Sequence, residues 1–305
     1  MTAGYPDDLR AIVDDYLDAL RFPARSPGVA GLEDAMRYSL LAGGKRIRPV
    51  LALATARAVD LDQDQALPLA AAIELIHTYS LIHDDLPAMD DDDLRRGRPT
   101  CHVAYGEDVA ILAGDALYAE AFHLLLRRRK GTEHPLPAER LLAAASELAD
   151  ATGVDGMVGG QFLDVTADKA SAEGNAVQTA DELRMLHELK TGRLIGASVG
   201  CVLQLAGLDD ERARPFREFA DHLGVLFQIV DDILDVTGTD AALGKPSGSD
   251  ERHDKRTYVT EYGLEGAQRM AATHHEAAED ALHAAVPSGA DDLHTLTTFI
   301  HTRTN

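Results

Sequence analysis

The sequence of 305 residues contains no tryptophan, two cysteines, and 29 lysine and arginine residues against 51 acidic ones. Cys101 and Cys201 cannot form a disulfide framework, so we expect the protein in a reducing compartment, the cytoplasm. The net charge of −22 argues against nucleic acid as a partner, because phosphate backbones need extended basic surface. It leaves room for a small anionic ligand, which needs only a local cluster of cations.

Long hydrophobic runs and alternating patterns are also scarce. We identify no apolar run long enough to predict a membrane span, and the acidic, amphipathic first twenty residues do not resemble a signal peptide. Alternation of apolar and polar residues, which is typical of strands, is hard to find. What the sequence does contain is helical periodicity, in a chain with 45% hydrophobic residues. We therefore predict an all-α protein with a single domain over residues 1–305.

Periodicity places the predicted helices at 7–22, 31–42, 47–59, 65–84, 107–129, 138–151, 156–165, 181–205, 211–237, 263–285 and 290–302. Residues 69–83 and 219–234 are apolar on nearly every side, which is typical of helices surrounded by protein. Polar segments rich in breakers separate the helices, and the longest of these segments covers 238–257.

Each of the two apolar segments ends in carboxylates, which are Asp84, Asp85 and Asp90 in the first and Asp231, Asp232 and Asp235 in the second. A buried ionised carboxylate is costly unless a cation or hydrogen-bond donors compensate it. One such cluster could be a solvated helix end, but two clusters at the ends of the two most central predicted helices favour a metal site. Asp231 and Asp235 lie one helical turn apart, and Pro87 interrupts the first helix so that Asp90 can approach Asp84.

Carboxylate ligands without cysteine favour Mg²⁺ over zinc. Magnesium binds through one or two carboxylates together with waters and phosphate oxygens, rather than in an all-protein cage. The two clusters therefore predict Mg²⁺ ions that bridge to a phosphorylated ligand.

Basic residues near the acids predict direct anion contacts. The segment GGKRIRP at 43–49 places Lys45 and Arg48 on one side of a helix start, where backbone amides and the helix dipole favour an anion. His77 lies two turns before Asp84 on the same helix face, although a lone histidine in an apolar helix is often a core residue. The other nearby cations are Arg95, Arg96, Lys190, Lys245 and Lys255.

At this point the motifs resemble those of a known family. HDDLPAMDDDDLRRGRPT (83–100) and FQIVDDILD (227–235) are similar to the two aspartate-rich motifs of the trans-isoprenyl diphosphate synthases. The remaining family motifs occur in the same order: GGKRIRP, ELIHTYSLIHDD, AGDAL, GGQFLD, HELKTG and GKPSGSDERHDK. The resemblance covers residues 30–265 and is strongest to the bacterial farnesyl diphosphate synthases, followed by geranylgeranyl diphosphate synthases.

The resemblance implies an antiparallel helical bundle around a central cavity, and a homodimer that binds small-molecule isoprenyl diphosphates, with neither nucleic acid nor membrane as partner. It implies Mg²⁺ as the cofactor, with about three ions per active site when diphosphate is bound. It also implies a head-to-tail prenyl transfer, in which an allylic diphosphate ionises and isopentenyl diphosphate attacks the resulting cation.

The same resemblance assigns roles to individual residues. Isopentenyl diphosphate would be bound by Lys45, Arg48, His77 and Arg96. The allylic diphosphate would be held by Arg95, Lys190, Thr191, Gln228, Lys245 and Lys255. The metal ligands would be Asp84, Asp85, Asp90, Asp231, Asp232 and Asp235. The catalytic residues nearest the cationic carbon would be Lys190, Thr191 and Gln228.

Tyr79 is the candidate for setting product length, because it precedes Asp84 by five residues and thus lies about 7.5 Å further along a helix. It could be simple core filling, but the resemblance, together with the insertion Pro87–Ala88, implies a floor that stops the chain at farnesyl diphosphate (C15), with geranylgeranyl diphosphate (C20) as the alternative.

Two other classes remain in view. A class I terpene cyclase uses the same metal and diphosphate chemistry, but it does not need the second anion site. A non-catalytic partner subunit would be expected to lose acids from one of the clusters, and both clusters are intact here.

Overall fold

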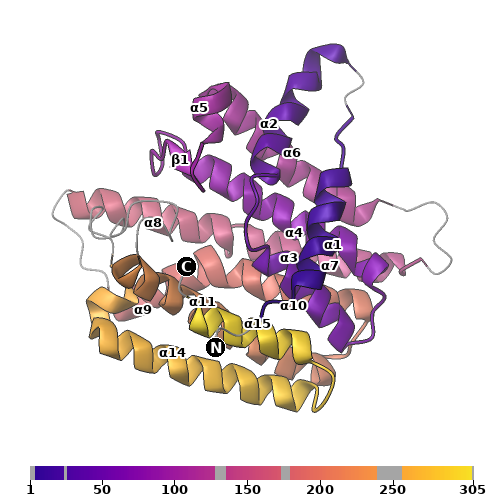
Figure 1. Cartoon of the computed structure of the whole chain (residues 1–305), viewed down its shortest axis with the longest axis vertical. Coiled ribbons are helices and arrows are strands. Elements are labelled where there is room, and N and C mark those ends of the chain that lie inside the picture. The colour runs from indigo at the N-terminus through magenta and orange to yellow at the C-terminus, as the bar shows by residue number, and fades with distance from the viewer. Residues whose placement is uncertain (1–3, 24–25, 128–134, 173–178, 239–255, 304–305) are drawn as a thin grey trace.

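The computed structural model describes residues 4–23, 26–127, 135–172, 179–238 and 256–303, and for 168–172 it describes the backbone only. Over these residues the protein is a bundle of helices, as the sequence predicts (Figure 1). The helices are α1 Asp7–Ala19, α2 Ala30–Leu40, α3 Ile47–Ala58, α4 Gln63–Asp84, α5 Cys101–Tyr105, α6 Glu107–Leu126, α7 Ala138–Thr152, α8 Met157–Ala172, α9 Ala180–His187, α10 Arg193–Ala206, α11 Asp210–Thr237, α14 Tyr258–Ala285 and α15 Asp291–Thr302. The remaining elements are a 3₁₀ turn η1 Pro27–Val29, a π-helical segment η2 Glu188–Gly192, and the antiparallel strands β1 Leu94–Arg95 and β2 Arg98–Pro99.

The predicted helices are present, with corrections at their ends and in their detail. The last long helix was expected to begin at residue 263, but α14 begins at Tyr258, because a capping box of Thr257 and Thr260 starts it and Gly263 only kinks it. The predicted helix 181–205 is α9 and α10 joined by η2. The hairpin β1–β2 and the five-residue helix α5 were not predicted, since neither is long enough to show a period.

The two apolar segments of the sequence form the centre of the bundle. Helix α4 packs against α3, α6 and α10, while α11 packs against α10 and α14. Ile73 and Leu75 on α4, and Leu223 and Leu226 on α11, have no exposed surface, and they belong to one connected cluster of buried apolar residues. The prediction that both segments are surrounded by protein is confirmed. Their acidic C-terminal ends are therefore held in place by the core.

The prediction that no apolar run reaches membrane-spanning length was wrong for α4 and α6, which are both long and apolar enough by composition. In α4, 67% of the apolar stretch is buried in the protein, so this helix is apolar because it lies in the core. In α6 the buried share is 33%, and Ile111, Leu112 and Leu126 are exposed. Helix α6 thus presents an apolar face to the outside of this chain.

Candidate active site

A cavity of 660 Å³ lies where α3, α4 and α11 meet the segment before α3. The residues predicted to bind isopentenyl diphosphate and the second acidic cluster line it together: Lys45, Arg48, His77, Arg96, Asp231, Asp232 and Asp235. Gln228, Glu74 and Arg303 are also in its wall. The structure therefore brings together side chains from distant parts of the sequence that had been grouped by motif alone.

The cations of this cavity are crowded and poorly solvated. Burial lowers the pKa of Arg48 and of Lys45, and Arg303 lowers both further by repulsion. The pKa of His77 is well below its usual value, first because of burial and then because of Arg48 and Arg96, so the imidazole is neutral at pH 7. Arg48 Nε is buried with no hydrogen-bond partner among the described residues. A bound anion would relieve both the repulsion and the unsatisfied donor.

Arg46 anchors the segment that carries two of these cations. Its Nη1 lies 2.6 Å from Glu74 Oε1, and both side chains are 3% exposed. Its Nε lies 2.9 Å from Asp14 Oδ1. Arg46 is thereby fixed at φ 54°, in the left-handed region, with Lys45 and Arg48 on either side of it reaching the cavity. Sequence reasoning missed this anchor, although Glu74 was visible as a lone acid in an apolar run.

The glycine pair before α3 shapes the route of Arg96 to the cavity. Arg96 donates to the Gly43 carbonyl oxygen. A Cβ on Gly44 would lie 2.6 Å from Arg96 Nη1, and Gly44 has φ 128°, so a side chain there would both clash and strain the backbone. Gly44, expected with Gly43 to let amides approach an anion, thus also makes room for the guanidinium.

The first acidic cluster forms at the end of α4. Helix α4 stops at Asp84, and the backbone N–H of Asp90 donates to the Asp84 carbonyl oxygen over 2.9 Å, so the chain curls back as Pro87 led us to expect. The pKa of Asp84 is raised to about 6, chiefly by burial and also by the charge of Asp90, against the opposing influence of Lys190. A buried carboxylate among like charges is the kind of site that a metal cation stabilises.

Arg95 is engaged with this cluster. Its Nε lies 2.7 and 3.0 Å from the two carboxylate oxygens of Asp85, and its Nη2 lies 2.5 Å from Asp85 Oδ1. One predicted ligand of the allylic diphosphate is therefore paired with one predicted metal ligand. Contact of Arg95 with a diphosphate would use its remaining N–H groups, chiefly those on Nη1, or would require this pair to open.

The π-helical segment η2 carries two of the predicted catalytic residues, Lys190 and Thr191, and the third, Gln228, lies on α11. Lys190 pairs with Asp164 of α8, and Thr191 donates to Gln228 Oε1 over 3.0 Å. A Cβ on Gly160 would lie 2.2 Å from the Lys190 backbone nitrogen, so this glycine allows α8 to pack directly against η2. Asp164 was not among the predicted site residues, even though the motif GGQFLD contains it.

Arg303, in the tail after α15, is a further residue that the sequence did not indicate. Its Nη2 lies 2.5 Å from Asp231 Oδ1 and 3.1 Å from the Phe227 carbonyl oxygen, and its guanidinium lies over the Phe227 ring at 4.2 Å. The tail therefore closes one side of the cavity. Nothing in the local sequence FIHTRTN signals this, because the contact depends on how α15 packs on α11.

The carboxylates of the two clusters fit Mg²⁺ by their chemistry. Oxygen donors at two helix ends are available, and burial and mutual repulsion favour a cation at Asp84. Among the described residues, no three acidic, histidine or cysteine side chains converge into a ready-made metal site.

Two predicted ligands of the allylic diphosphate, Lys245 and Lys255, lie outside the described residues, as does most of the polar segment 238–257. The other predicted site residues are all described.

Tyr79 lies on the α4 face next to the first acidic cluster. Its ring makes edge-to-face contacts with His83 at 5.4 Å and with Tyr118 of α6 at 5.1 Å. Its pKa is raised to about 12, by burial first and then by Tyr118 and Asp84. Tyr118 in turn lies 5.4 Å from Phe122, and its hydroxyl lies 3.2 Å from Thr152 Oγ1. The predicted floor is thus part of an aromatic cluster that involves a second helix.

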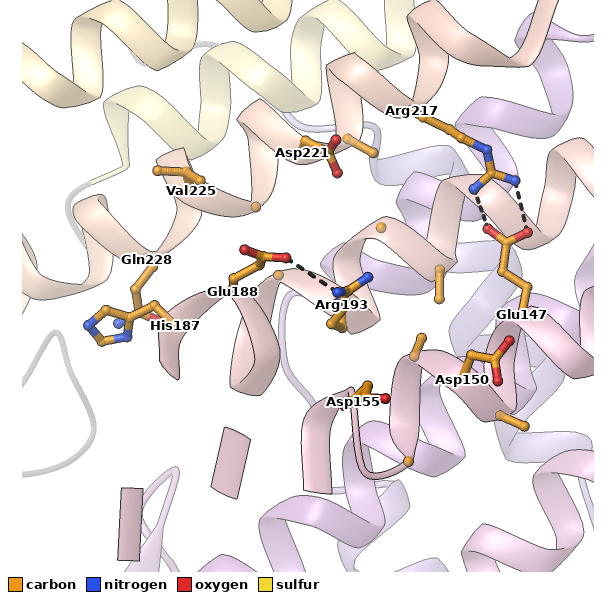
Figure 2. Close-up of a pocket in the computed structure, with 18 of the residues that line it drawn as sticks. Glu147, Asp150, Asp155, His187, Glu188, Arg193, Arg217, Asp221, Val225 and Gln228 are labelled. Carbon is orange, nitrogen blue, oxygen red and sulfur yellow. Dashed lines mark hydrogen bonds and ion pairs between the residues drawn. The ribbon is translucent and has the colours of Figure 1, made fainter. Parts of the chain in front are cut away.

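A second cavity, of 1150 Å³, lies between α7, α10 and α11 (Figure 2). Figure 2 shows Gln228 and His187 towards one end of it and the pair of Arg217 and Glu147 towards the other. Glu188 and Arg193 form another pair across its wall. Because Arg193 and Arg217 pair with acids of the same wall, and Asp150, Asp155 and Asp221 also line it, this cavity is not organised for a diphosphate, despite its size. Gln228 lines both cavities.

These features define an all-α protein with a cation-lined cavity beside the acidic end of α11, and with a second acidic cluster at the end of α4. The family model for polyprenyl synthetases matches residues 29–287, and the chain belongs to this family of prenyltransferases.

The similar proteins include synthases of two product lengths. The chain is 47% identical to the farnesyl diphosphate synthase of Geobacillus stearothermophilus over 270 residues, which is 88% of each protein. It is also 47% identical to the chloroplastic geranylgeranyl pyrophosphate synthase of Capsicum annuum over 241 residues, which is 79% of this chain and 63% of that protein.

Solved structures agree on the fold. An FPP/GFPP synthase from Zymomonas mobilis aligns with a TM-score of 0.83 and 33% identity, covering 97% of both chains. A geranyltransferase from Legionella pneumophila aligns with a TM-score of 0.81 and 36% identity, covering 98% of this chain and 94% of that one.

Proposed function

We propose that this protein condenses isopentenyl diphosphate with dimethylallyl or geranyl diphosphate and releases farnesyl diphosphate, acting through one catalytic domain with Mg²⁺ as cofactor. The observation that carries the proposal is the 660 Å³ cavity, in which Lys45, Arg48, His77 and Arg96 meet the second acidic cluster. A terpene cyclase has no use for a second, metal-free anion site beside its metal-binding acids.

The chain's own residues would bind and orient the two substrates. Lys45, Arg48 and Arg96 would hold the diphosphate of isopentenyl diphosphate, and the neutral His77 would donate a hydrogen bond to it. Lys190 would hold the allylic diphosphate beside Asp84. Mg²⁺, when bound by aspartates such as Asp84, Asp90 and Asp231, would supply the charge that neutralises the leaving group.

The bond changes balance without a covalent intermediate on the protein. The allylic C–O bond breaks and its electron pair leaves on the diphosphate. The double bond of isopentenyl diphosphate supplies the electrons of the new C–C bond, which leaves a cation on the isopentenyl unit. A C–H bond next to this cation then breaks, its electrons form the new double bond, and the released diphosphate takes the proton. Thr191 and Gln228 would lie next to the cationic carbon, from which water must be excluded because it would quench the cation.

Farnesyl diphosphate as the product is supported by Tyr79 and its aromatic partners, which place bulk below the first acidic cluster. The Geobacillus relative, a farnesyl diphosphate synthase, also supports this product. Geranylgeranyl diphosphate is the alternative, because a geranylgeranyl synthase matches at the same identity.

We further propose a cytoplasmic homodimer, with neither membrane nor nucleic acid as partner. The exposed apolar side chains Ile111 and Leu112 on α6, with Val158 and Phe162 on α8, would be covered by a second copy of the chain. This explains the apolar composition of α6 without a lipid bilayer. Sedimentation should give a mass of two chains.

The test of the function is direct. Purified protein is mixed with Mg²⁺, radiolabelled isopentenyl diphosphate and each allylic primer in turn, and the products are separated by chain length. Incorporation of label into a C15 diphosphate is the expected result. Conversion of an allylic diphosphate to a hydrocarbon without uptake of label would indicate a cyclase, and no conversion with any primer would indicate a non-catalytic subunit.

A further inference from the structure

Asp232 receives hydrogen bonds from protein groups on both of its carboxylate oxygens. Gln228 Nε2 donates to Oδ1 over 2.8 Å, and the backbone N–H of Tyr258 donates to Oδ2 over 2.7 Å. The residue is 2% exposed. Tyr258 is the first residue of α14, where N–H groups have no partner within the helix and the helix dipole is positive. This carboxylate therefore ties α11 to the start of α14.

The same carboxylate fixes the orientation of the Gln228 side chain. An ionised carboxylate can only accept hydrogen bonds, so Gln228 must turn its NH₂ group towards Asp232. Its Oε1 then faces the other way and accepts from the Thr191 hydroxyl, 3.0 Å away. Thr191 has one O–H group and uses it in this bond. Towards any other neighbour, Thr191 Oγ1 can offer only lone pairs.

We propose that Asp232 is a positioning residue: by orienting the Gln228 amide, it makes the Thr191 hydroxyl donate to Gln228 and present only its oxygen lone pairs elsewhere. This role, rather than ligation of Mg²⁺, is why the reaction requires Asp232. The inference rests on the proposed function, in which Thr191 and Gln228 lie beside an allylic cation. Oriented oxygen lone pairs stabilise such a cation. If the Gln228 amide were reversed, Thr191 would accept from its NH₂ and would point its own O–H at the positive carbon.

Asp232→Asn is the informative substitution, because it is nearly isosteric. Its oxygen can still accept from the Tyr258 N–H, which preserves the start of α14. Its NH₂ group would then face Gln228 and favour the reversed amide. We expect kcat for prenyl transfer to fall about 10- to 100-fold, because preorganised dipoles at the reacting centre are lost. We expect the Mg²⁺ concentration that gives half-maximal rate to stay within about twofold.

The adjacent residue supplies a comparison for metal binding. Asp231→Asn removes a carboxylate oxygen from a proposed Mg²⁺ ligand one position away, and it should raise the Mg²⁺ requirement about tenfold or more. An Asp232→Asn enzyme whose Mg²⁺ requirement rises as much as that of Asp231→Asn would overturn the proposal. So would an Asp232→Asn enzyme with unchanged kcat.

Exchanging the carboxylate and the amide between positions 232 and 228 tests the hydrogen-bonded chain Asp232–Gln228–Thr191, which we call the relay. In Asp232→Asn/Gln228→Glu, the carboxylate at position 228 can accept from the amide at position 232 and also from the Thr191 hydroxyl, so the polarity of Thr191 is restored. We expect kcat to recover about tenfold relative to Asp232→Asn alone. A metal ligand at position 232 could not be rescued in this way, and a swap with no recovery would contradict the positioning role.

Two further measurements separate positioning from helix capping and from the proposed function. Thr257→Ala removes the N-cap side chain of α14 and leaves the relay intact. It should lower Tm while kcat stays within about twofold. A loss of kcat equal to that of Asp232→Asn would overturn the proposal. The NMR signals of the Gln228 side-chain NH₂ should shift on Asp232→Asn, and unchanged signals would overturn it without reference to activity. A wild-type protein that transfers no prenyl group would instead overturn the proposed function.

Discussion

The Arg303 guanidinium lies 2.5 Å from Asp231 Oδ1, so the tail of the chain occupies a carboxylate that we expect to bind Mg²⁺. Only one oxygen of Asp231 carries this contact, and 44% of its side chain is exposed. Arg303 also adds positive charge next to Lys45 and Arg48. It can therefore act on both proposed ligands: it competes with the metal at Asp231 and attracts a diphosphate to the cations.

These two effects give Arg303→Ala a distinctive signature. We expect KM for isopentenyl diphosphate to rise about 10-fold, because a cation is lost from its site, while the Mg²⁺ requirement does not rise. Arg303→Lys keeps the charge and should stay close to wild type in both. Steady-state kinetics at several Mg²⁺ concentrations measure this, and a rise in the Mg²⁺ requirement of Arg303→Ala would show that the pairing with Asp231 serves another purpose.

The acidic clusters should be essential for turnover. Asp84→Ala and Asp231→Ala are each expected to lower kcat by several orders of magnitude, and EDTA should abolish turnover, because the charge of the leaving group is then left without stabilisation. Asp93→Ala is a matched control, since this exposed acid belongs to the same run of aspartates. If Asp84→Ala kept the kcat of the control, the metal-bridging account would fail.

The two anion sites should separate in KM. Arg48→Ala and His77→Ala are expected to raise KM for isopentenyl diphosphate much more than KM for the allylic substrate, because both residues line the cation-rich cavity. Lys190→Ala should do the reverse and also lower kcat, since Lys190 lies near Asp84, where the leaving group would bind. Exchanged effects would mean that we have assigned the two sites the wrong way round.

Acid sensitivity should depend on His187. Its pKa is lowered from 6.5 to about 4, mainly by burial, and its ring stacks on Tyr258. Between these two pKa values the unfolded chain binds more protons than the folded one, so stability is lost as pH falls, by up to about 3 kcal/mol for this one group.

His187→Gln should therefore lose less stability than wild type when the pH falls from 7 to 4.5. His123→Gln, which changes a histidine whose side chain is 62% exposed, is the control and should behave as wild type. Denaturant unfolding at several pH values measures this, and parallel pH profiles for wild type and both variants would show that other groups govern acid sensitivity.

The sequence predicted what periodicity and local spacing can carry. The return of Asp90 to Asp84 followed from Pro87, and the burial of α4 and α11 followed from their apolar composition. The sequence could not indicate the contact of Arg303 with Asp231, because this contact depends on the packing of α15 on α11. Nor could it reveal that Asp232 accepts from the start of α14, since Tyr258 follows Asp232 by 26 positions and no local pattern signals their approach.

The same limit applies to the proposed floor of the elongation site. Spacing along one helix identified Tyr79, but Tyr118 comes from α6, and only the structure places the two rings 5.1 Å apart. Removing Tyr79 alone therefore leaves a second aromatic ring, held by its contact of 3.2 Å with Thr152.

Product length should respond to both rings. Tyr79→Ala is expected to shift the products from C15 towards C20, because the growing chain gains the volume of one phenol. Tyr79→Ala/Tyr118→Ala should allow still longer products, while Tyr118→Phe removes only the hydroxyl contact and should retain C15. Tyr262→Ala, on α14, is the control for loss of an aromatic ring elsewhere. Chromatography of the products after phosphatase treatment measures the distribution. A wild type that releases mainly C20, or a double variant that still stops at C15, would show that other residues limit the chain.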